Sequence, residues 1–513
     1  GINELKFERK LNLMKQSLEK NTLIIALITG SVIWGGTSVY AEEPEQVFTL
    51  DPMVVTAQRM ETRDLDTPAA VEVLNHEQLI ATGGNNLQEA LKFGTGLMFQ
   101  SQGTKGTSQG TMNSKIIIRG VEKGTLVLVD GVPLNQSGRY NLEDISTEMV
   151  EKVEIIRGGG AVLYGSEATG GVINIITRGK RPNKIKTSFG NYEQQSHAIS
   201  LQASKLGVSY AYDKIGNIDN ISDPNGGRPV GNYYTITRGE HNNFNIRYDF
   251  NDKLYFSHTY NENNAHYVYR YKPQNGAINK DVIHTIKNHM SQLHYDDKSI
   301  KAVLYYNDKK QNAFTKARNS KSKPTEYLET MKSLSNAGYH DKSLGFDVQK
   351  NWTLNKNTAI LGLSVQRDTC DYSEDSLTLS TNKYTSAERD YKRNMYSVYG
   401  QYAYAMSKAS DIIFSARETW TGSTKADKLD GINYSKFTPE LEYITKLNDD
   451  TSIYAKAGQS FMMPTFTQMF GSGNIVGNAD LKPQHGNHFE IGFKKNTENH
   501  AWRLALFNYK IKD

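Results

Sequence analysis

Aromatic and cationic side chains occur together at two places in this chain of 513 residues. The first group is Arg139 and Tyr140. The second group is Tyr267, Tyr269, Arg270 and Tyr271. Ring faces beside cations attract a large anionic ligand that carries conjugated rings. For any single residue of these groups, a solvated loop is the simpler interpretation. The pattern therefore predicts a binding surface to which several segments contribute.

Catalytic and metal-binding motifs are missing from the sequence. It has no nucleophile elbow, no zinc-binding helix and no Gly-Lys-Ser ending of a phosphate loop. Cys370 is the single cysteine, which excludes an internal disulfide and a multi-cysteine metal site. The 60 basic and 55 acidic residues nearly balance, so charge does not indicate a nucleic-acid binder. We therefore predict a protein that is not an enzyme, has no cofactor or resident metal and binds no nucleic acid.

A short strip of mostly β-branched residues precedes the first folded region. Its members are Asp51, Pro52, Met53, Val54, Val55, Thr56 and Ala57. The proline cannot lie in a central strand or in the interior of a helix. Such a strip cannot bury itself, but it can add to the open edge of another protein's sheet through main-chain hydrogen bonds. A plain linker is the alternative interpretation, and the strip alone leaves both open.

An apolar segment near the start of the chain is typical of a secretion signal. Lys20 precedes the apolar run Leu23–Ile28, and Val39–Ala41 has the small-x-small pattern of a cleavage site. The apolar run is too short for a membrane anchor. We therefore predict upstream residues and a signal peptide over 1–41, followed by an exported segment over 42–57.

Residues 58–180 combine short strands, helices and glycine turns. Ala70–Leu74 predicts a strand, and Asn75 predicts the cap of a helix that begins at His76. Further strands are predicted over 115–119, 125–129, 150–156 and 172–177. The mixture indicates an α+β domain of ordinary size.

The same region carries an ordered series of motifs that is similar to a known family. The motifs are Ile118–Gly120, Leu126–Asn135, Val153–Gly158, Leu163–Ser166 and Ala168–Thr177. Together they resemble the plug domain of TonB-dependent outer-membrane receptors. One departure is Gly159, which stands where the family usually has a proline and makes the turn more flexible.

The resemblance implies roles for several residues outside and inside these motifs. The strip 51–57 lies where the family carries its TonB box, the strand that pairs with the energy-transducing protein TonB. Arg119 and Arg157 follow apolar strands, so each needs an acceptor if it is buried. The resemblance implies that both dock the plug on glutamates of the barrel. Glu490 is the one such glutamate that can be matched, and two separate surface arginines are the alternative.

From residue 184 onward the sequence alternates apolar and polar side chains. Residues 357–366 are typical, with Leu361, Leu363 and Val365 on one face. About fifteen such strands are predicted, and short and long connections alternate between them. That alternation is typical of outer-membrane barrels and seldom occurs in soluble sandwiches. Because lipid offers no partner to an open sheet edge, we expect the sheet to close.

The long connections of this region are expected to carry the binding residues. Three of them are predicted over 263–290, 307–342 and 366–394. The first contains the tyrosine group, and the second is rich in lysine. With the apex of the plug, they are expected to form the binding surface.

The number of strands falls short of what the resemblance implies. The family's barrel has about twenty-two strands, of which about fifteen are found over 181–513. Residues 478–483 and 489–493 resemble a region that other strands normally follow. We therefore expect a C-terminally truncated receptor, and an incomplete barrel whose open edges oppose insertion into lipid.

The fold class that results is all-β, an antiparallel transmembrane barrel around an N-terminal α+β plug domain. The resemblance implies active transport of an iron complex, a ferric siderophore, across the cell outer membrane, with TonB as the partner. Haem is a rival cargo, since Phe461–Pro464 and Asn478–Leu481 loosely resemble the paired boxes of haem receptors, although no histidine lies between them. Cobalamin, a passive porin or adhesin, and an inactive fragment remain alternatives.

Overall fold

The computed structural model describes residues 53–54, 59–100, 115–122, 124–135, 138–159, 161–179, 182–222, 232–271, 277–318, 331–427, 429–472, 476–497 and 500–512. The predicted signal peptide and five of the seven residues of the strip 51–57 lie outside this range. Met53–Val54 forms strand β1, which pairs antiparallel with β2 (Thr62–Arg63).

The N-terminal domain is the predicted mixture of strands and helices. Its elements after β2 are η1 (Asp64–Asp66), β3 (Ala70–Asn75), α2 (His76–Ala81), α3 (Leu87–Ala90), η2 (Leu91–Phe93), β4 (Leu97–Gln100), β5 (Lys115–Ile118), β6 (Thr125–Val129), β7 (Val132–Pro133), η3 (Thr147–Met149), β8 (Val150–Arg157), α4 (Ala161–Tyr164) and β9 (Gly171–Thr177). The Asn75 cap is confirmed, because its side chain accepts from the backbone N–H of Gln78.

Five strands of this domain form a mixed sheet in the order β3-β8-β9-β6-β7. Only β6 and β9 pair in parallel. Alternate side chains of these strands enter two different apolar clusters, one with Val127 and Ile173 and the other with Leu126 and Val172. The centre of the sheet is therefore buried on both faces, which explains why β6 and β9 are almost wholly apolar.

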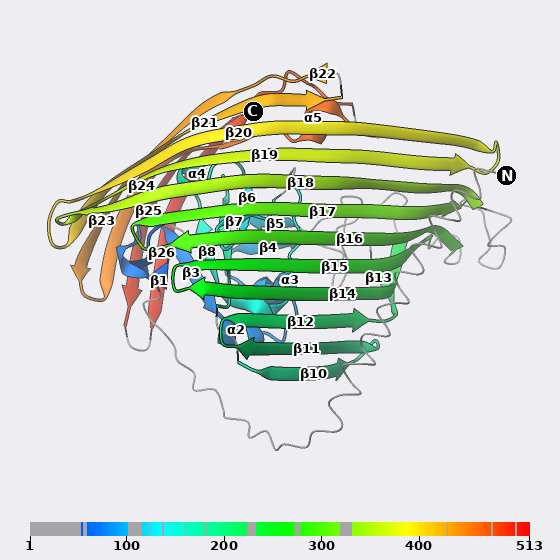
Figure 1. Cartoon of the computed structure of the whole chain (residues 1–513), viewed down its shortest axis with the longest axis horizontal. Coiled ribbons are helices and arrows are strands. Elements are labelled where there is room, and N and C mark those ends of the chain that lie inside the picture. The colour runs from blue at the N-terminus through cyan, green and yellow to red at the C-terminus, as the bar shows by residue number, and fades with distance from the viewer. Residues whose placement is uncertain are drawn as a thin grey trace, which may run out of the picture. The chain divides into compact units, whose positions relative to one another are not determined.

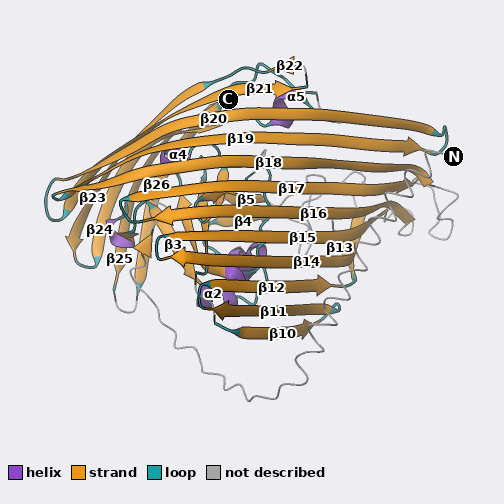
Figure 2. Ribbon diagram, in the orientation of Figure 1, coloured by secondary structure: helices purple, strands orange, loops and turns teal. Residues whose placement is uncertain are grey.

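The rest of the chain forms one antiparallel sheet of seventeen strands in sequence order (Figure 1). Its strands are β10 (Lys184–Gly190), β11 (Gln194–Ala203), β12 (Leu206–Ile215), β13 (Ile218–Ser222), β14 (Asn232–Asn251), β15 (Leu254–Tyr271), β16 (Ala277–Asp296), β17 (Ile300–Arg318), β18 (Met331–Leu354), β19 (Asn357–Thr378), β20 (Lys383–Ala405), β21 (Ser410–Ala426), β22 (Leu429–Asp430), β23 (Ser435–Asn448), β24 (Thr451–Met462), β25 (Gln484–Asn496) and β26 (Ala501–Lys512). The short helix α5 (Phe466–Phe470) follows β24. Figure 2 shows how far strands outweigh helices.

The fifteen predicted strands are all present, and β13 and β22 are short additions beside the pairings β12–β14 and β21–β23. Short turns join β14 to β15, β16 to β17 and β18 to β19, as predicted. We call the end of the sheet with these turns the short-turn end, and the opposite end the long-loop end.

The predicted long connections 263–290, 307–342 and 366–394 are wrong in large part, because most of these residues lie in strands. β17 continues to Arg318 and β18 begins at Met331. Residues 307–312 are polar on both faces, so the alternation that marks a half-buried strand disappears there although the backbone pairing continues.

The two faces of the large sheet differ in chemistry. On β19, Leu361 and Leu363 are each 52% exposed, while the side chains between them face the other way. The buried polar residues of the sheet are numerous and include Asn245, Asn261 and Gln311. One face is therefore an exposed apolar surface, and the other is polar and largely covered, as in a membrane barrel.

The sheet is open, with β10 and β26 as its two edges, so the expectation that it closes is wrong for the strands that the structure describes. In the part of the chain that the structure describes, no helix is both long enough and apolar enough to span a membrane.

Candidate functional site

Arg119 of the N-terminal domain forms a buried ion pair with the large sheet. It lies in the tight turn after β5 with a φ of +54°, and its Nη1 lies 2.6 Å from Oε2 of Glu490 on β25. Nη1 also donates to the hydroxyl of Tyr509 on β26 at 2.9 Å, and Tyr454 donates to the other oxygen of Glu490. Burial alone would lower the pKa of Arg119, but Glu490 outweighs it and the pKa is raised. The guanidinium is therefore charged where it meets the sheet.

A second ion cluster anchors the beginning of the same domain. Lys494 Nζ on β25 donates at 2.8 Å to a carboxylate oxygen of Asp64, and also to the carbonyl oxygens of Asp64 and Thr67. Arg503 on β26 donates to the other carboxylate oxygen at 2.5 Å. The side chains of Asp64 and Lys494 are each only 1% exposed. A buried amine with three acceptors is well satisfied, so this contact fixes η1 on the sheet.

The glycine turn after β8 approaches the same strands very closely. Gly159 has a φ of +35°, and a Cβ placed on it would lie 2.3 Å from Nε2 of His488. His488 in turn lies 2.7 Å from the carboxylate of Glu440 on β23. The turn therefore needs glycine for a steric reason, in addition to the flexibility that the sequence suggested.

Arg157 does not make the predicted contact with the large sheet. Its guanidinium donates to Glu72 on β3 and to the carbonyl oxygen of Thr95, both within the N-terminal domain. Arg157 is the last residue of β8, and β3 is the neighbour of β8 in the five-stranded sheet, so Glu72 lies within reach of its guanidinium. The prediction that both arginines reach barrel glutamates is thus wrong for Arg157.

Arg139 and Tyr140, predicted to bind ligand, have other contacts in the structure. Arg139 Nη2 donates to both carboxylate oxygens of Asp341 on β18 at 2.7 Å, and its guanidinium lies 4.0 Å from the Tyr339 ring centroid. Tyr140 belongs to the core of the N-terminal domain, and its hydroxyl accepts from the N–H of Ile116. Burial raises the pKa of Tyr140. Arg139 therefore forms a third ion pair between the N-terminal domain and the sheet.

The predicted tyrosine group lies on β15 rather than in a loop. Tyr267 is 3% exposed, its hydroxyl lies 2.9 Å from Nε2 of His284, and its ring packs edge-on against Tyr269. The backbones of Arg270 and Tyr271 end the strand, and their side chains lie outside the described part of the structure. A ligand-binding role for this group stays a prediction.

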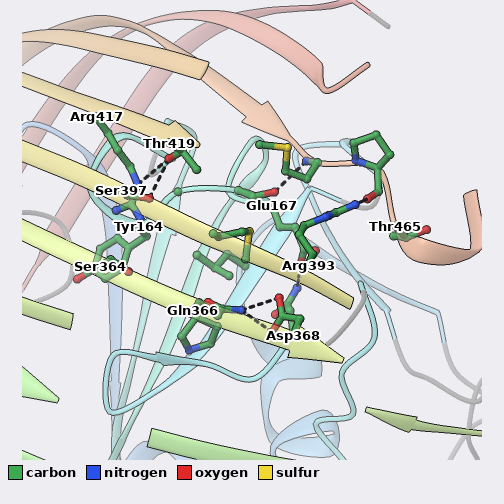
Figure 3. A pocket seen from close by; sticks show the side chains of 18 of the residues that line it. Tyr164, Glu167, Ser364, Gln366, Asp368, Arg393, Ser397, Arg417, Thr419 and Thr465 are labelled. Carbon is green, nitrogen blue, oxygen red and sulfur yellow. Dashed lines mark hydrogen bonds between the residues drawn. The ribbon is translucent and has the colours of Figure 1, made fainter. Parts of the chain in front are cut away.

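A cavity of about 90 Å³ lies between the N-terminal domain and the middle of β19, β20 and β21 (Figure 3). We call it the mid-strand cavity. It is lined by Tyr164, Glu167, Asp368, Arg393 and Arg417, among others. Figure 3 shows the carboxyl group of Glu167 and the guanidinium of Arg393 in this space. Burial raises the pKa of Glu167 to about 7, against the opposing hydrogen bond from Asn135. Two cations and two acids therefore surround the space.

A larger cavity of about 410 Å³ lies toward the short-turn end, and we call it the turn-end cavity. It is bordered by Arg59, Tyr164 and Lys152 from the N-terminal domain and by Asp296 and Asp347 from β16 and β18. Arg59 Nη1 lies 2.9 Å from Asp347 Oδ1. Burial alone would lower the pKa of Arg59, but the charge of Asp347 outweighs burial and raises it. Within the described residues, no group of three or more His, Cys, Asp or Glu side chains could hold a metal ion.

The sequence alone did not identify Arg59, Asp64, Tyr164 and Lys494 as residues at the boundary between the N-terminal domain and the large sheet. For Lys494 a signal was available, because it shares a strand face with Glu490 at the two-residue period of β25. Arg59 and Asp64 carry no local signal, since their partners lie 288 and 430 residues away in the sequence.

Two family models match the chain in succession. The TonB-dependent receptor plug domain matches residues 63–172, and the TonB dependent receptor-like β-barrel matches residues 179–513. Over 189 residues the chain is 31% identical to the vitamin B12 transporter BtuB of Vibrio cholerae serotype O1, in a match that covers 36% of this chain and 29% of that protein. The chain thus spans less than a third of the length of this curated relative.

Solved structures share the fold at low sequence identity. The ferripyoverdine receptor of the outer membrane of Pseudomonas aeruginosa matches with a TM-score of 0.64 at 14% identity, over 89% of this chain and 65% of that one. The ferric yersiniabactin uptake receptor FyuA of Yersinia pestis matches with a TM-score of 0.62 at 17% identity, over 87% of this chain and 72% of that one. Since the β-barrel model alone takes in more than half of the residues, the chain belongs to the TonB-dependent receptor family.

Proposed function

We propose that this chain acts in the outer membrane as a receptor for the active, TonB-dependent uptake of an iron complex, with a ferric siderophore as the cargo. The N-terminal domain is the plug, the large sheet is the barrel wall, and the strip 51–57 is the TonB box. The protein performs transport and no chemical step on its cargo.

The observation that carries this proposal is the charged contact between the plug and the polar face of the sheet. Asp64 and Arg119 form buried ion pairs with β25, and Arg139 forms one with β18. A plug held by ion pairs can be displaced and returned, because water can solvate each charge when the pair opens. The exposed apolar face opposite would contact lipid.

The strip 51–57 supplies the connection to the energy source. Its first described residues, Met53 and Val54, pair with Arg63 and Thr62 of β2. Two short strands alone are only marginally stable in water. An exchange of β2 for the edge strand of TonB would therefore cost little, and force applied to the strip would reach Arg59 and Asp64 first.

Cobalamin is a second candidate cargo. The observation that favours it is the similarity over 189 residues to a protein described as a vitamin B12 transporter. The mid-strand cavity holds cations beside aromatic rings, which suits an anionic ferric complex, and also two acids. The cargo assays below therefore include both classes and haem.

The test is uptake by energised cells that express the chain as their only such receptor. The probes are radiolabelled ferric hydroxamate, ferric catecholate, haemin and cyanocobalamin. Residues 51–57 are deleted in one variant and replaced in the control by seven residues of a Gly/Ser linker, so that loss of length and loss of sequence are separated. We expect at least one probe to enter the unaltered strain and neither variant. Equal uptake with and without the strip would contradict active transport and would favour a passive pore.

A further inference from the structure

The mid-strand cavity and the turn-end cavity meet at one side chain. Among the described residues that line them, Tyr164 is the one that borders both. It ends the short helix α4, and the carbonyl oxygen of the preceding Leu163 accepts a hydrogen bond from Arg417 at 3.1 Å. Gly165, with a φ of +94°, follows it, and a Cβ there would lie 3.3 Å from the guanidinium of Arg417. The backbone on either side of Tyr164 is therefore held against β21.

The ring of Tyr164 is held by a separate group. The guanidinium carbon of Arg59 lies 4.6 Å from the centroid of the Tyr164 ring and 4.3 Å from that of Tyr399 on β20. Arg59 also contacts the Tyr399 hydroxyl and pairs with Asp347. One cation thus lies between a plug ring and a barrel ring, in a place largely removed from water, where cation–π attraction is strongest.

Arg59 lies two residues after Ala57, the last residue of the proposed box. Two residues span at most about 7 Å of extended chain, so a displacement of the box by more than that must move Arg59. Once Arg59 leaves, the Tyr164 ring loses its cation, while its backbone remains fixed by Arg417. The expected motion is therefore a change of the side-chain rotamer and not a loss of α4.

We infer that Tyr164 is a gate between the two cavities, closed by the Arg59 side chain and opened when the box is pulled. The path it controls runs along the boundary between plug and sheet, from the mid-strand cavity to the short-turn end. The inference rests on the proposed function, and it adds the route that cargo would take and the residue that limits passage.

The test measures passage of a small solute that needs neither the box nor the cargo site. Cells without general porins express the chain together with a periplasmic β-lactamase, and hydrolysis of externally added nitrocefin reports entry. Tyr164→Ala is expected to raise entry about tenfold over the unaltered chain, because the barrier then lacks both its ring and its cation–π contact. Tyr164→Phe retains a ring face and is expected to remain near the unaltered rate.

The matched control is Tyr255→Ala, which removes a tyrosine ring that lines the turn-end cavity only. Arg59→Met is expected to raise entry as well, but less than Tyr164→Ala. Equal entry through Tyr164→Ala and Tyr255→Ala would overturn the inference. Should Tyr164→Ala not reach the outer membrane, Tyr164→Leu keeps most of the volume and removes the ring. If the proposed function is wrong, deletion of residues 51–57 leaves cargo uptake unchanged. That result is independent of the nitrocefin measurement.

Discussion

The plug meets the large sheet in two regions of different chemistry. At β23–β26 the contacts are tight, with Asp64 on Lys494, Arg119 on Glu490 and Gly159 against His488. Along β16–β21, Arg139 pairs with Asp341 and Arg59 with Asp347, but two cavities lie beside these contacts. The side chain between the two cavities is the aromatic ring of Tyr164. This difference indicates that the contacts at β23–β26 hold the plug in place, whereas the boundary along β16–β21 also has space for a solute beside the plug.

The largest expected effect comes from the tight contacts at β23–β26. In Lys494→Met, the carboxylate of Asp64 keeps Arg503 but loses its fully buried partner, which should lower the free energy of unfolding by about 3 to 5 kcal/mol. The measurement is thermal unfolding of the protein in detergent, together with proteolysis of the plug. Lys495→Met is the matched control, because Lys495 is the next residue on β25 and faces the opposite side of the strand. Equal losses in the two variants would show that the contact of Lys494 with Asp64 does not hold the plug.

A smaller effect is expected at the glycine turn. Gly159→Ala adds a Cβ at 2.3 Å from His488 Nε2 and also strains a positive φ, for a cost of about 2 to 3 kcal/mol in unfolding free energy. Gly131→Ala separates the two causes, since Gly131 has a φ of +81° but no atom within 4 Å of the added Cβ. It should cost about 1 kcal/mol, the contribution of backbone strain alone. Thermal unfolding that ranks the two variants equally would show that the contact with His488 is unimportant.

A third expected effect lies in the region with cavities and depends on pH. Because burial raises the pKa of Glu167 to about 7, the folded protein binds a proton there that the unfolded chain has already released. Stability from this group is therefore present below its ordinary pKa and is lost as pH rises to about 7, by up to about 3 kcal/mol.

The corresponding measurement is the melting temperature of the unaltered chain and of Glu167→Gln between pH 5 and pH 8. The variant should lose this part of the pH dependence, while Glu151→Gln, at an exposed carboxylate of the plug, should keep it. Parallel profiles for all three proteins would contradict a raised pKa at Glu167.

Much of the fold was predictable because period-two alternation marks each strand where one face is apolar. The alternation disappears at residues 307–312, where both faces are polar, so the prediction ends this strand at residue 306 although β17 continues to Arg318. The site was less predictable. The pair of Arg119 with Glu490 followed from motifs, but Arg157 has its partner inside the plug, and nothing near Tyr164 in the sequence indicates two cavities. Such contacts depend on how the plug is oriented against the sheet, which local patterns do not encode.

The most direct test of this account is a double-mutant cycle between Arg119 and Glu490, measured by thermal unfolding in detergent. The cycle uses Arg119→Met, Glu490→Gln and the combination of both. The account predicts that the two changes are coupled by about 2 kcal/mol, because either single change leaves the other charge buried without its partner. Additive effects, with a coupling below about 0.5 kcal/mol, would show that the plug does not contact β25 in this way and would contradict the account.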